Sequence, residues 1–263
     1  MLEVWRAADD IEVFESGWTS DHFYPMHGAG LSAPRLEGWT TLTALAQATR
    51  RLRLGTLVTG IHYRHPALLA NMAATLDIIS GGRLELGIGT GWNEQESAAY
   101  GIELGTPRQR SDRFEEACQV LTGLLSPQET TTFQGSYYQL TSARCNPRPV
   151  QQPHPPICIG GSGRKRTLRT AARFAQHWNF DGGTVEQFTR ARDVLHQHCT
   201  EIGRDPAQIL LSSQVQFEGD PAEAAAAAAA LGSAGAGLAI VYLPPPHTPA
   251  ALEPLAGALS ELS

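Results

Sequence analysis

An acid and a histidine stand side by side in the early segment Trp18-Thr19-Ser20-Asp21-His22-Phe23-Tyr24-Pro25. The preceding residues predict a strand over 17–21, so the pair would lie at the carboxyl end of that strand. An imidazole, whose unperturbed pKa is roughly 6.5, can donate or accept a proton near neutral pH. We therefore interpret His22, with Asp21 beside it, as a candidate general acid or base. Taken alone, the dipeptide fits better with Asp21 capping the next loop and His22 packing in the interior.

Two segments rich in small residues follow in the chain. Leu-Gly-Thr-Leu-Val-Thr-Gly at 54–60 ends in a small-residue turn, which would let a flat ring approach the backbone. Ser-Gly-Gly-Arg-Leu-Glu-Leu-Gly-Ile-Gly-Thr-Gly-Trp-Asn at 80–93 could turn peptide N–H groups toward a ligand, but it lacks the Gly-Lys-Ser/Thr of a P-loop. A tight turn without a ligand explains the first segment equally well, and glycine packing inside a barrel could explain the second.

A third glycine turn, Gly160-Gly161-Ser162-Gly163, leads into a helix predicted over 164–175. The start of a helix offers free N–H groups and the positive end of its dipole, which together favour a phosphate. Arg164, Lys165 and Arg166 add positive charge at the same place. We interpret this turn as a phosphate site, the alternative being an ordinary left-handed turn with solvated basic side chains.

Metal and hydrolase chemistry find little support in the sequence. His196 and His198 would point away from each other on a helix, and the cysteines lie far apart without a Cys-x-x-Cys pair. We therefore expect no metal site. The Gly-x-Ser-x-Gly elbow is absent, and Lys165 is the single lysine available for a Schiff base.

The elements that must position these residues alternate between strands and helices. Short apolar runs predict strands over 17–21, 52–59, 84–89, 156–160, 177–180, 209–217 and 237–242. Helical patterns cover 2–14, 40–50, 66–80, 108–125, 164–175, 185–202, 221–231 and 250–262. This alternation is typical of a parallel sheet with helical crossovers.

A closed barrel fits the alternation better than a doubly wound sheet. A Rossmann domain would carry its glycine fingerprint after the first strand, where this chain has Ser20-Asp21-His22. We therefore predict an α/β fold of the TIM (β/α)8 type, forming a single domain over residues 1–263. We expect the first barrel strand to be missing, because a helix over 2–14 comes first and no strand precedes it. Residues 127–156, with two short strands around Gly135, form a predicted insertion.

Composition is that of a soluble globular protein, with 42% hydrophobic and 17% charged residues. The net charge is −6 and the basic residues are scattered, so we expect no nucleic-acid partner. No apolar run approaches the roughly 18 residues of a membrane span, and we see no signal peptide. We therefore expect a cytoplasmic protein with reduced cysteines and no membrane partner.

Taken in order, these segments resemble the luciferase-like flavin and deazaflavin oxidoreductases, in particular their F420-dependent branch. Besides the strings at 54–60 and 80–93, the resemblance rests on Ser-Asp-His-Phe at 20–23, Tyr-Arg-His-Pro at 63–66, Ile-Gly-Gly-Ser-Gly at 159–163 and Ala-Gln-His-Trp-Asn at 175–179. Any one string is weak, but together they follow one order from about residue 5 to residue 180.

The resemblance implies a TIM-type barrel with an insertion that binds coenzyme F420, or alternatively FMN, at the carboxyl ends of its strands. Asp21 and His22 would lie beside the ring, with His22 as the proton donor or acceptor. A bulge at Val58, Thr59 and Gly60, often with a non-proline cis peptide in this family, would support the ring. The remaining implied contacts are Thr90, Gly91 and Asn93 to the ring or its side chain, and Gly161, Ser162 and Gly163 to the phosphate.

Three functions remain open at this point. The first is hydride transfer between F420 and a small organic substrate; the second is an FMN-dependent monooxygenase that uses dioxygen and reduced flavin from a partner reductase. The third is a non-catalytic flavin- or deazaflavin-binding protein. We favour the first, because a pure binder has no use for Asp21 and His22, and because residues 164–166 could hold the carboxylate tail that distinguishes F420 from FMN. We also expect a homodimer, a common state in this family, and name a flavin or F420 reductase as a further candidate partner.

Overall fold

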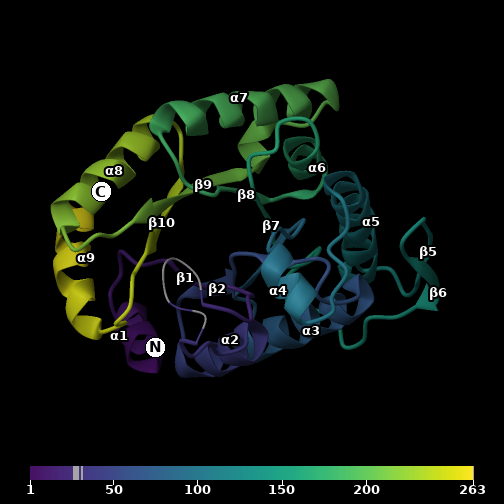
Figure 1. Cartoon of the computed structure of the whole chain (residues 1–263), viewed down its shortest axis with the longest axis horizontal. Coiled ribbons are helices and arrows are strands. Elements are labelled where there is room, and N and C mark those ends of the chain that lie inside the picture. Colours follow the sequence, from purple (N-terminus) through teal and green to yellow (C-terminus); the bar gives the residue numbers. More distant parts are fainter. Residues whose placement is uncertain (26–29, 31, 263) are drawn as a thin grey trace. The chain divides into compact units, whose positions relative to one another are not determined.

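The computed structural model describes residues 1–25, 30 and 32–262. Strands and helices alternate along the chain (Figure 1). The chain divides into two compact units, which we describe separately: unit 1 comprises Met1–Gly17, Ala48–Leu52 and Cys158–Ser263, and unit 2 comprises Trp18–Gln47 and Arg53–Ile157. The prediction of one domain stays a prediction.

Unit 2 carries the strands that lead to the candidate catalytic residues. Its strands are β1 (Ser16–Thr19, which begins in unit 1), β2 (Arg53–Thr56), β3 (Thr59–Gly60) and β4 (Leu84–Gly89). Strand β2 lies between β1 and β4, and both β2 and β3 pair with β4 in parallel. The helices are α2 (Gly38–Ala48), α3 (Pro66–Ser80), α4 (Glu94–Ala99) and α5 (Pro107–Leu125).

Strand β4 is buried along its whole length, and its glycines make room for the neighbouring chain. A Cβ on Gly87 would overlap the carbonyl oxygen of Thr56, and one on Gly89 would lie 2.7 Å from a methyl group of Val58. The Leu57–Val58 peptide between β2 and β3 is cis. The single strand predicted over 52–59 is therefore wrong in detail, because a bulge packed against β4 divides it into β2 and β3.

A hairpin interrupts the alternation, as the prediction of an insertion over 127–156 requires. It consists of β5 (Thr131–Gln134) and β6 (Gln139–Ala143), which pair antiparallel and extend beyond α5 (Figure 1). Glu116 of α5 fixes its turn, because the carboxylate accepts the N–H groups of Ser136, Tyr137 and Tyr138 at 2.7, 2.8 and 3.2 Å.

Unit 1 contains a second run of parallel strands, in the order β7 (Ile157–Gly160), β8 (His177–Phe180), β9 (Leu210–Gln216) and β10 (Leu238–Tyr242). The helices of this unit are α1 (Leu2–Asp9), α6 (Thr167–Phe174), α7 (Val185–Glu201), α8 (Pro221–Ser233) and α9 (Leu252–Ser260), with short 3-10 turns at Pro206–Gln208 and Pro249–Ala251. Helices α7, α8 and α9 lie on one side of β8, β9 and β10 (Figure 1). Trp178 and Phe188 stack between the sheet and α7, with ring centroids 5.7 Å apart.

Two helices depart by three residues or more from a predicted end, and one short helix was not predicted. The helix predicted over 2–14 ends at Asp9. Beyond it, the Arg51 guanidinium donates hydrogen bonds of 2.8 Å to the carbonyl oxygens of Ile11 and Phe14, which a longer helix would use for its own backbone. The helix predicted over 164–175 begins only at Thr167. Helix α4 is absent from the prediction, since six residues are too few to show an apolar period.

Within residues 1–25, 30 and 32–262, no helix combines the length and the apolar character needed to cross a membrane.

Candidate active site

His22 lies just after β1, is 9% exposed, and is held from one side by Glu96 of α4. Its Nδ1 is 2.6 Å from Oε2 of Glu96, a fully buried residue. An ionised carboxylate can only accept a hydrogen bond, so this contact places the proton of a neutral imidazole on Nδ1. Nε2 is then the basic nitrogen, available to a reacting group.

The Glu96 carboxylate also organises the backbone around His22. It accepts the N–H groups of Phe23 and Tyr24, the second at 2.9 Å, and the hydroxyl of Tyr63 at 2.7 Å. Burial raises the pKa of the Glu96 carboxyl, but the hydrogen bonds from His22, Tyr63 and the two backbone groups outweigh it and lower that pKa below its ordinary value. Glu96 is therefore an anion at neutral pH. Burial, and then the hydrogen bond to this anion, raise the pKa of Tyr63, which stays a neutral donor.

Asp21 is fully buried, and its carboxylate is engaged by Arg64. The same guanidinium lies 3.4 Å from Glu37, whose carboxylate also accepts N–H groups of Trp39 and Thr40 in the first turn of α2. The ion pair between Asp21 and Arg64 thus connects the end of β1 to the segment before α3. Asp21 stays a predicted site residue, but it is Glu96 that contacts the His22 imidazole.

The predicted ring-supporting residues Val58, Thr59 and Gly60 form the bulge and the short strand after it. Thr59 turns its side chain inward, where its hydroxyl lies 2.9 Å from Nε1 of Trp39 and 2.9 Å from the hydroxyl of Thr56. Thr59 is fully buried, and its predicted contact with the ring stays a prediction. Val58 is half-buried above Gly89, and Gly60 lies against the rings at positions 62 and 63.

Thr90, Gly91 and Asn93 follow β4 and lead into α4. Gly91 has a φ of +81°, and its carbonyl oxygen accepts a hydrogen bond from Arg110 at 3.2 Å. The side-chain oxygen of Asn93 accepts the N–H of Glu96 at 3.0 Å and so caps α4. Asn93 therefore positions the helix that carries Glu96, and its contact with a cofactor stays a prediction. Thr90 is half-exposed at the end of the strand.

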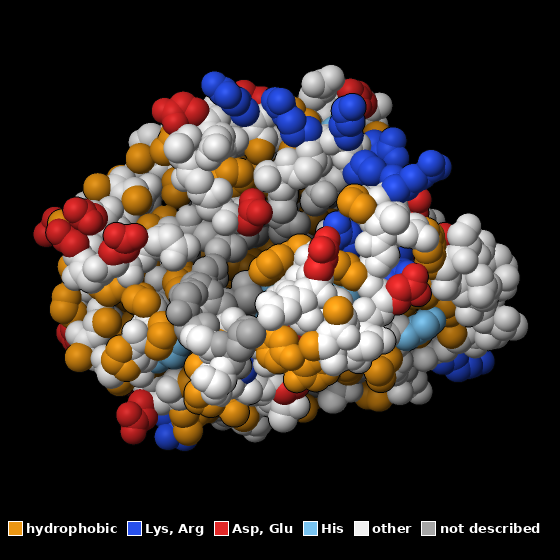
Figure 2. Space-filling model, viewed as in Figure 1, with side chains coloured by type: hydrophobic (Ala, Val, Ile, Leu, Met, Phe, Trp, Pro, Cys, Tyr) orange, Lys and Arg blue, Asp and Glu red, His pale blue; other side chains and the backbone are white. Residues whose placement is uncertain are grey.

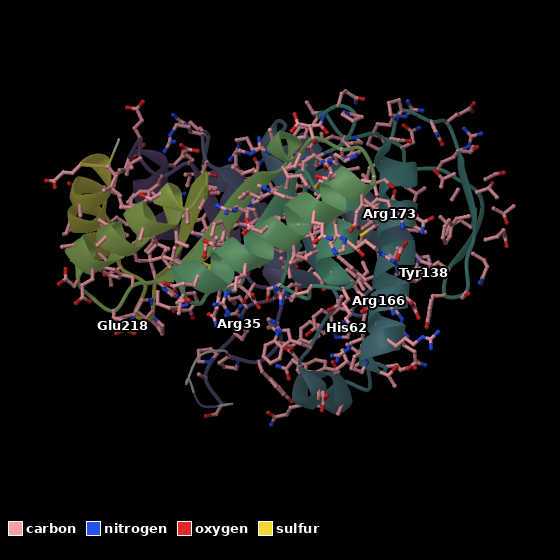
Figure 3. All side chains as sticks on the ribbon, turned by 90° about the horizontal axis from the view of Figure 1, so that it is seen from above. Arg35, His62, Tyr138, Arg166, Arg173 and Glu218 are labelled. Atoms are coloured by element: carbon pink, nitrogen blue, oxygen red, sulfur yellow. The ribbon has the colours of Figure 1, made fainter. Side chains whose placement is uncertain are left out.

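His62, labelled in Figure 3, lies between Gly60 and Gly91 and next to α4. The Ser97 hydroxyl donates to the carbonyl oxygen of Asn93 at 2.7 Å, so it accepts from Nε2 of His62 at 3.1 Å. Nδ1 of His62 is buried and has no hydrogen-bond partner among the described residues. Burial and then the positive charge of Arg113 lower the pKa of His62 to about 4, so the ring is neutral.

The predicted phosphate loop, Gly161, Ser162 and Gly163, belongs to unit 1. Gly161 has a φ of +111°, donates to the carbonyl oxygen of Asn179 at 3.1 Å and accepts Nε1 of Trp178 at 2.9 Å. At the other end, Nε2 of His198 lies 2.9 Å from the carbonyl oxygen of Arg164. The loop is therefore held on both sides.

This loop has the groups that an anion requires. In the part of the chain that the structure describes, no hydrogen bond reaches the N–H groups of Ser162 and Gly163. Helix α6 begins without a side-chain cap and without an acid in its first turn. Lys and Arg side chains gather over α6 and α7 (Figure 2), and Arg164 and Lys165 are exposed.

The residues that sequence reasoning missed are Glu96, Tyr63, Arg64 and His62. The spacing Asn93-x-x-Glu96 is a signal of a helix start and could have revealed α4. No local pattern could have paired Glu96 with a histidine 74 positions earlier. Among the described residues, no group of His, Cys, Asp and Glu side chains is arranged to hold a metal ion.

Comparisons with known proteins identify relatives of this chain. A family model described as luciferase-like monooxygenase matches residues 1–262. The F420-dependent glucose-6-phosphate dehydrogenase of Microbacterium testaceum is 33% identical over 212 residues, which cover 79% of this chain and 61% of that protein. The chain spans only 49% of the length of an uncharacterized Mycobacterium tuberculosis relative, to which it is 34% identical over 54% of its own length.

Several solved structures resemble this one, among them two F420-dependent enzymes. An F420-dependent secondary alcohol dehydrogenase in complex with an F420-acetone adduct superposes with a TM-score of 0.74 at 26% identity, covering 87% of this chain and 68% of that one. The coenzyme F420-dependent tetrahydromethanopterin reductase of Methanopyrus kandleri superposes with a TM-score of 0.82 at 18% identity, covering 99% of this chain and 94% of that one. The second likeness confirms the predicted α/β fold of the TIM-barrel type with an inserted hairpin.

Proposed function

Because the chain belongs to the luciferase-like monooxygenase family, as its motifs predict, we propose that it is an oxidoreductase that transfers a hydride between coenzyme F420 and a small organic substrate. One observation carries this proposal: the His22 imidazole is fixed at Nδ1 by a buried carboxylate and keeps Nε2 for a proton. The F420-dependent relatives support the choice of cofactor.

Each unit, taken by itself, has residues that suit one part of the cofactor. The N–H groups of Ser162 and Gly163 suit its phosphate, since hydrogen-bond donors and a helix start favour an anion. Val58 of the bulge and the turn at Thr90–Gly91 are half-exposed and would offer surface to a flat ring. When bound, F420 supplies a ring that accepts or donates a hydride.

In the direction of alcohol oxidation, His22 takes the proton. The substrate O–H proton would move to Nε2 of His22 as a C=O bond forms, and bound F420 would supply the acceptor for the hydride of the C–H bond. Glu96 stabilises the resulting imidazolium because its anionic carboxylate stays hydrogen-bonded to Nδ1. Reduction of a ketone is the reverse.

We propose F420 and not FMN because of the positive charges that follow the glycine loop. Both cofactors have a flat tricycle and a phosphate, so the bulge and the glycine loop do not separate them. F420 continues into a tail with further carboxylates, and exposed Arg164 and Lys165 directly follow the loop in a chain of net charge −6. These cations would interact with the tail and not with FMN.

The variant His22→Ala tests the catalytic assignment. Turnover with F420 should fall about 100-fold or more, the usual scale for losing a general acid or base, while F420 affinity stays within a few-fold. His154→Ala is the matched control, because that ring contacts the carbonyl oxygen of Pro155 away from the site. Unchanged turnover with a weakened cofactor complex would contradict the role of His22.

Fluorescence titration of the apoprotein with F420 and with FMN tests the cofactor. F420 should bind more tightly, and its affinity should fall with added salt and in a double variant Arg164→Glu, Lys165→Glu. Arg148→Glu, an exposed cation in unit 2, should leave the affinity unchanged. Tighter binding of FMN would favour instead a monooxygenase that uses dioxygen and reduced flavin from a partner reductase.

A further inference from the structure

A large aromatic side chain stands exposed next to the proposed acid–base group. Trp92 is 59% exposed, and its ring centroid lies 5.5 Å from that of His22. Apolar residues exposed to this degree are usually isolated, whereas this one adjoins the reactive imidazole. A molecule that reaches His22 from solvent along this ring would cover part of the indole.

Further aromatic rings extend this surface. Phe23 packs between Tyr63 and Tyr100, with centroid distances of 4.9 and 4.6 Å, and Tyr100 is itself 53% exposed. We call Phe23, Tyr63, Trp92 and Tyr100 the aromatic wall. Aromatic rings stack with other rings and bind apolar surface, so the wall suits a ligand with an aromatic or alicyclic group.

The charges beside the wall do not favour an anion. The hydrogen-bond partner of His22 is the Glu96 carboxylate, and the Arg64 guanidinium is shared by the carboxylates of Asp21 and Glu37. Two further arginines at the margin donate to backbone, Arg35 to Ser20 and Arg110 to Gly91. With Arg113 and Glu103, whose side chains lie 4.0 Å apart, this part of unit 2 has four carboxylates and four guanidinium groups, and so no surplus of positive charge to attract a phosphorylated substrate.

We propose, on the basis of the proposed function, that the substrate is an uncharged alcohol or ketone bearing an aromatic or alicyclic group, and that Trp92 binds this group. His22 takes or gives the hydroxyl proton while the apolar group lies against the indole. Trp92 is thus a specificity-determining residue, separate from the proton transfer and from the phosphate loop.

Steady-state kinetics with F420 test the substrate class. The wild-type protein should oxidise 1-phenylethanol with a kcat/KM at least tenfold above that for 2-propanol, and glucose 6-phosphate should be the poorest of the three. Trp92→Ala should lower the ratio of the first two values about tenfold, the scale of losing a few apolar contacts to a substrate, whereas Trp92→Phe should largely keep it. The control Leu68→Ala, which removes an equally exposed apolar side chain on α3, should keep the ratio.

Binding measured without turnover separates this proposal from the proposed function. Saturation-transfer NMR should detect acetophenone bound to the wild-type protein and to Leu68→Ala, with a several-fold weaker signal for Trp92→Ala, whether or not F420 is present. Equal acetophenone signals in all variants, or a preference for glucose 6-phosphate, would overturn the substrate class. Failure of F420 to bind, with the acetophenone signals as expected, would instead contradict the cofactor assignment and leave the role of Trp92 supported.

Discussion

Among the single residues, His22 and Glu96 form the contact on which the proposed acid–base role depends. It joins a ring that is 9% exposed to a carboxylate that is fully buried, so neither group can exchange its partner for water without moving. Tyr63 and two backbone N–H groups hold the same carboxylate. Glu96 therefore acts as a positioning residue, which selects the tautomer of His22 and supplies a negative charge to it.

We expect Glu96→Gln to lower kcat about tenfold or more and to change F420 affinity by no more than a few-fold. The amide can donate to Nδ1, which would place the ring proton on Nε2, and it no longer stabilises the imidazolium. Glu116→Gln is the matched control, because Glu116 likewise accepts backbone N–H groups but lies at the hairpin. Wild-type kcat in Glu96→Gln, measured with F420 saturating, would refute the positioning role.

The neutral His62 predicts a pH dependence of stability. Its pKa in the folded protein is about 4, below the ordinary value of 6.5, so the unfolded chain binds more protons between these values. The free energy of unfolding should therefore fall as pH drops from 6.5 toward 4, by at most about 3 kcal/mol from this group.

The variant His62→Phe keeps a ring against Tyr63 and removes the titration. Urea denaturation of both proteins at several pH values gives the difference in their free energies of unfolding. As pH decreases from 6.5 toward 4, the wild-type protein should lose stability relative to the variant. A difference that does not vary with pH would show that His62 titrates at an ordinary pKa.

Helix α4 is the element on which the site depends most, although it has only six residues. It carries Glu96 and Ser97, which contact His22 and His62. A helix this short derives little stability from its own hydrogen bonds, so its cap and its side-chain contacts hold it in place. The cap is Asn93, whose side-chain oxygen accepts the N–H of Glu96.

Removal of this cap should affect both stability and turnover. We expect Asn93→Ala to lower the free energy of unfolding by about 1 kcal/mol and kcat at least several-fold, because Glu96 would lose its fixed position. Thr106→Ala removes the cap of α5 and should reduce stability similarly without an effect on kcat. Thermal melts and kinetics on both variants make the comparison; equal kcat values in the two would show that α4 needs no cap to hold Glu96.

At the scale of the whole molecule, we expect a homodimer. Strand β10 ends the strand order of unit 1, and in the described part of the chain it pairs with β9 alone. An open strand edge is commonly covered by a helix or by another chain, and two-fold dimers are the commonest assemblies. Light scattering coupled to size exclusion should give twice the chain mass of 28.3 kDa, and a monomer over the micromolar range would contradict the expectation.

Local patterns in the sequence were enough to predict most helices and strands and the glycine turn before α6. Strands β4 and β8 and helix α3 have the predicted bounds, because hydrophobic period, proline and glycine act over a few neighbouring residues. The glycine turn at Gly161–Gly163 was recognisable for the same reason. The start of α6 and the division into β2 and β3 were not, because contacts from other segments decide them.

The alternating α/β architecture, the family motifs and His22 as the acid–base candidate all follow from the amino-acid sequence. The partner of that histidine does not, because Asp21 is its neighbour in sequence while Glu96 is 74 positions away. The half-buried Arg64 pairs with the fully buried Asp21 carboxylate, since an unpaired charge in the interior would be costly. The physical reason is general: backbone patterns depend on neighbouring residues, whereas the pairing of buried charges depends on which segments the fold brings into contact.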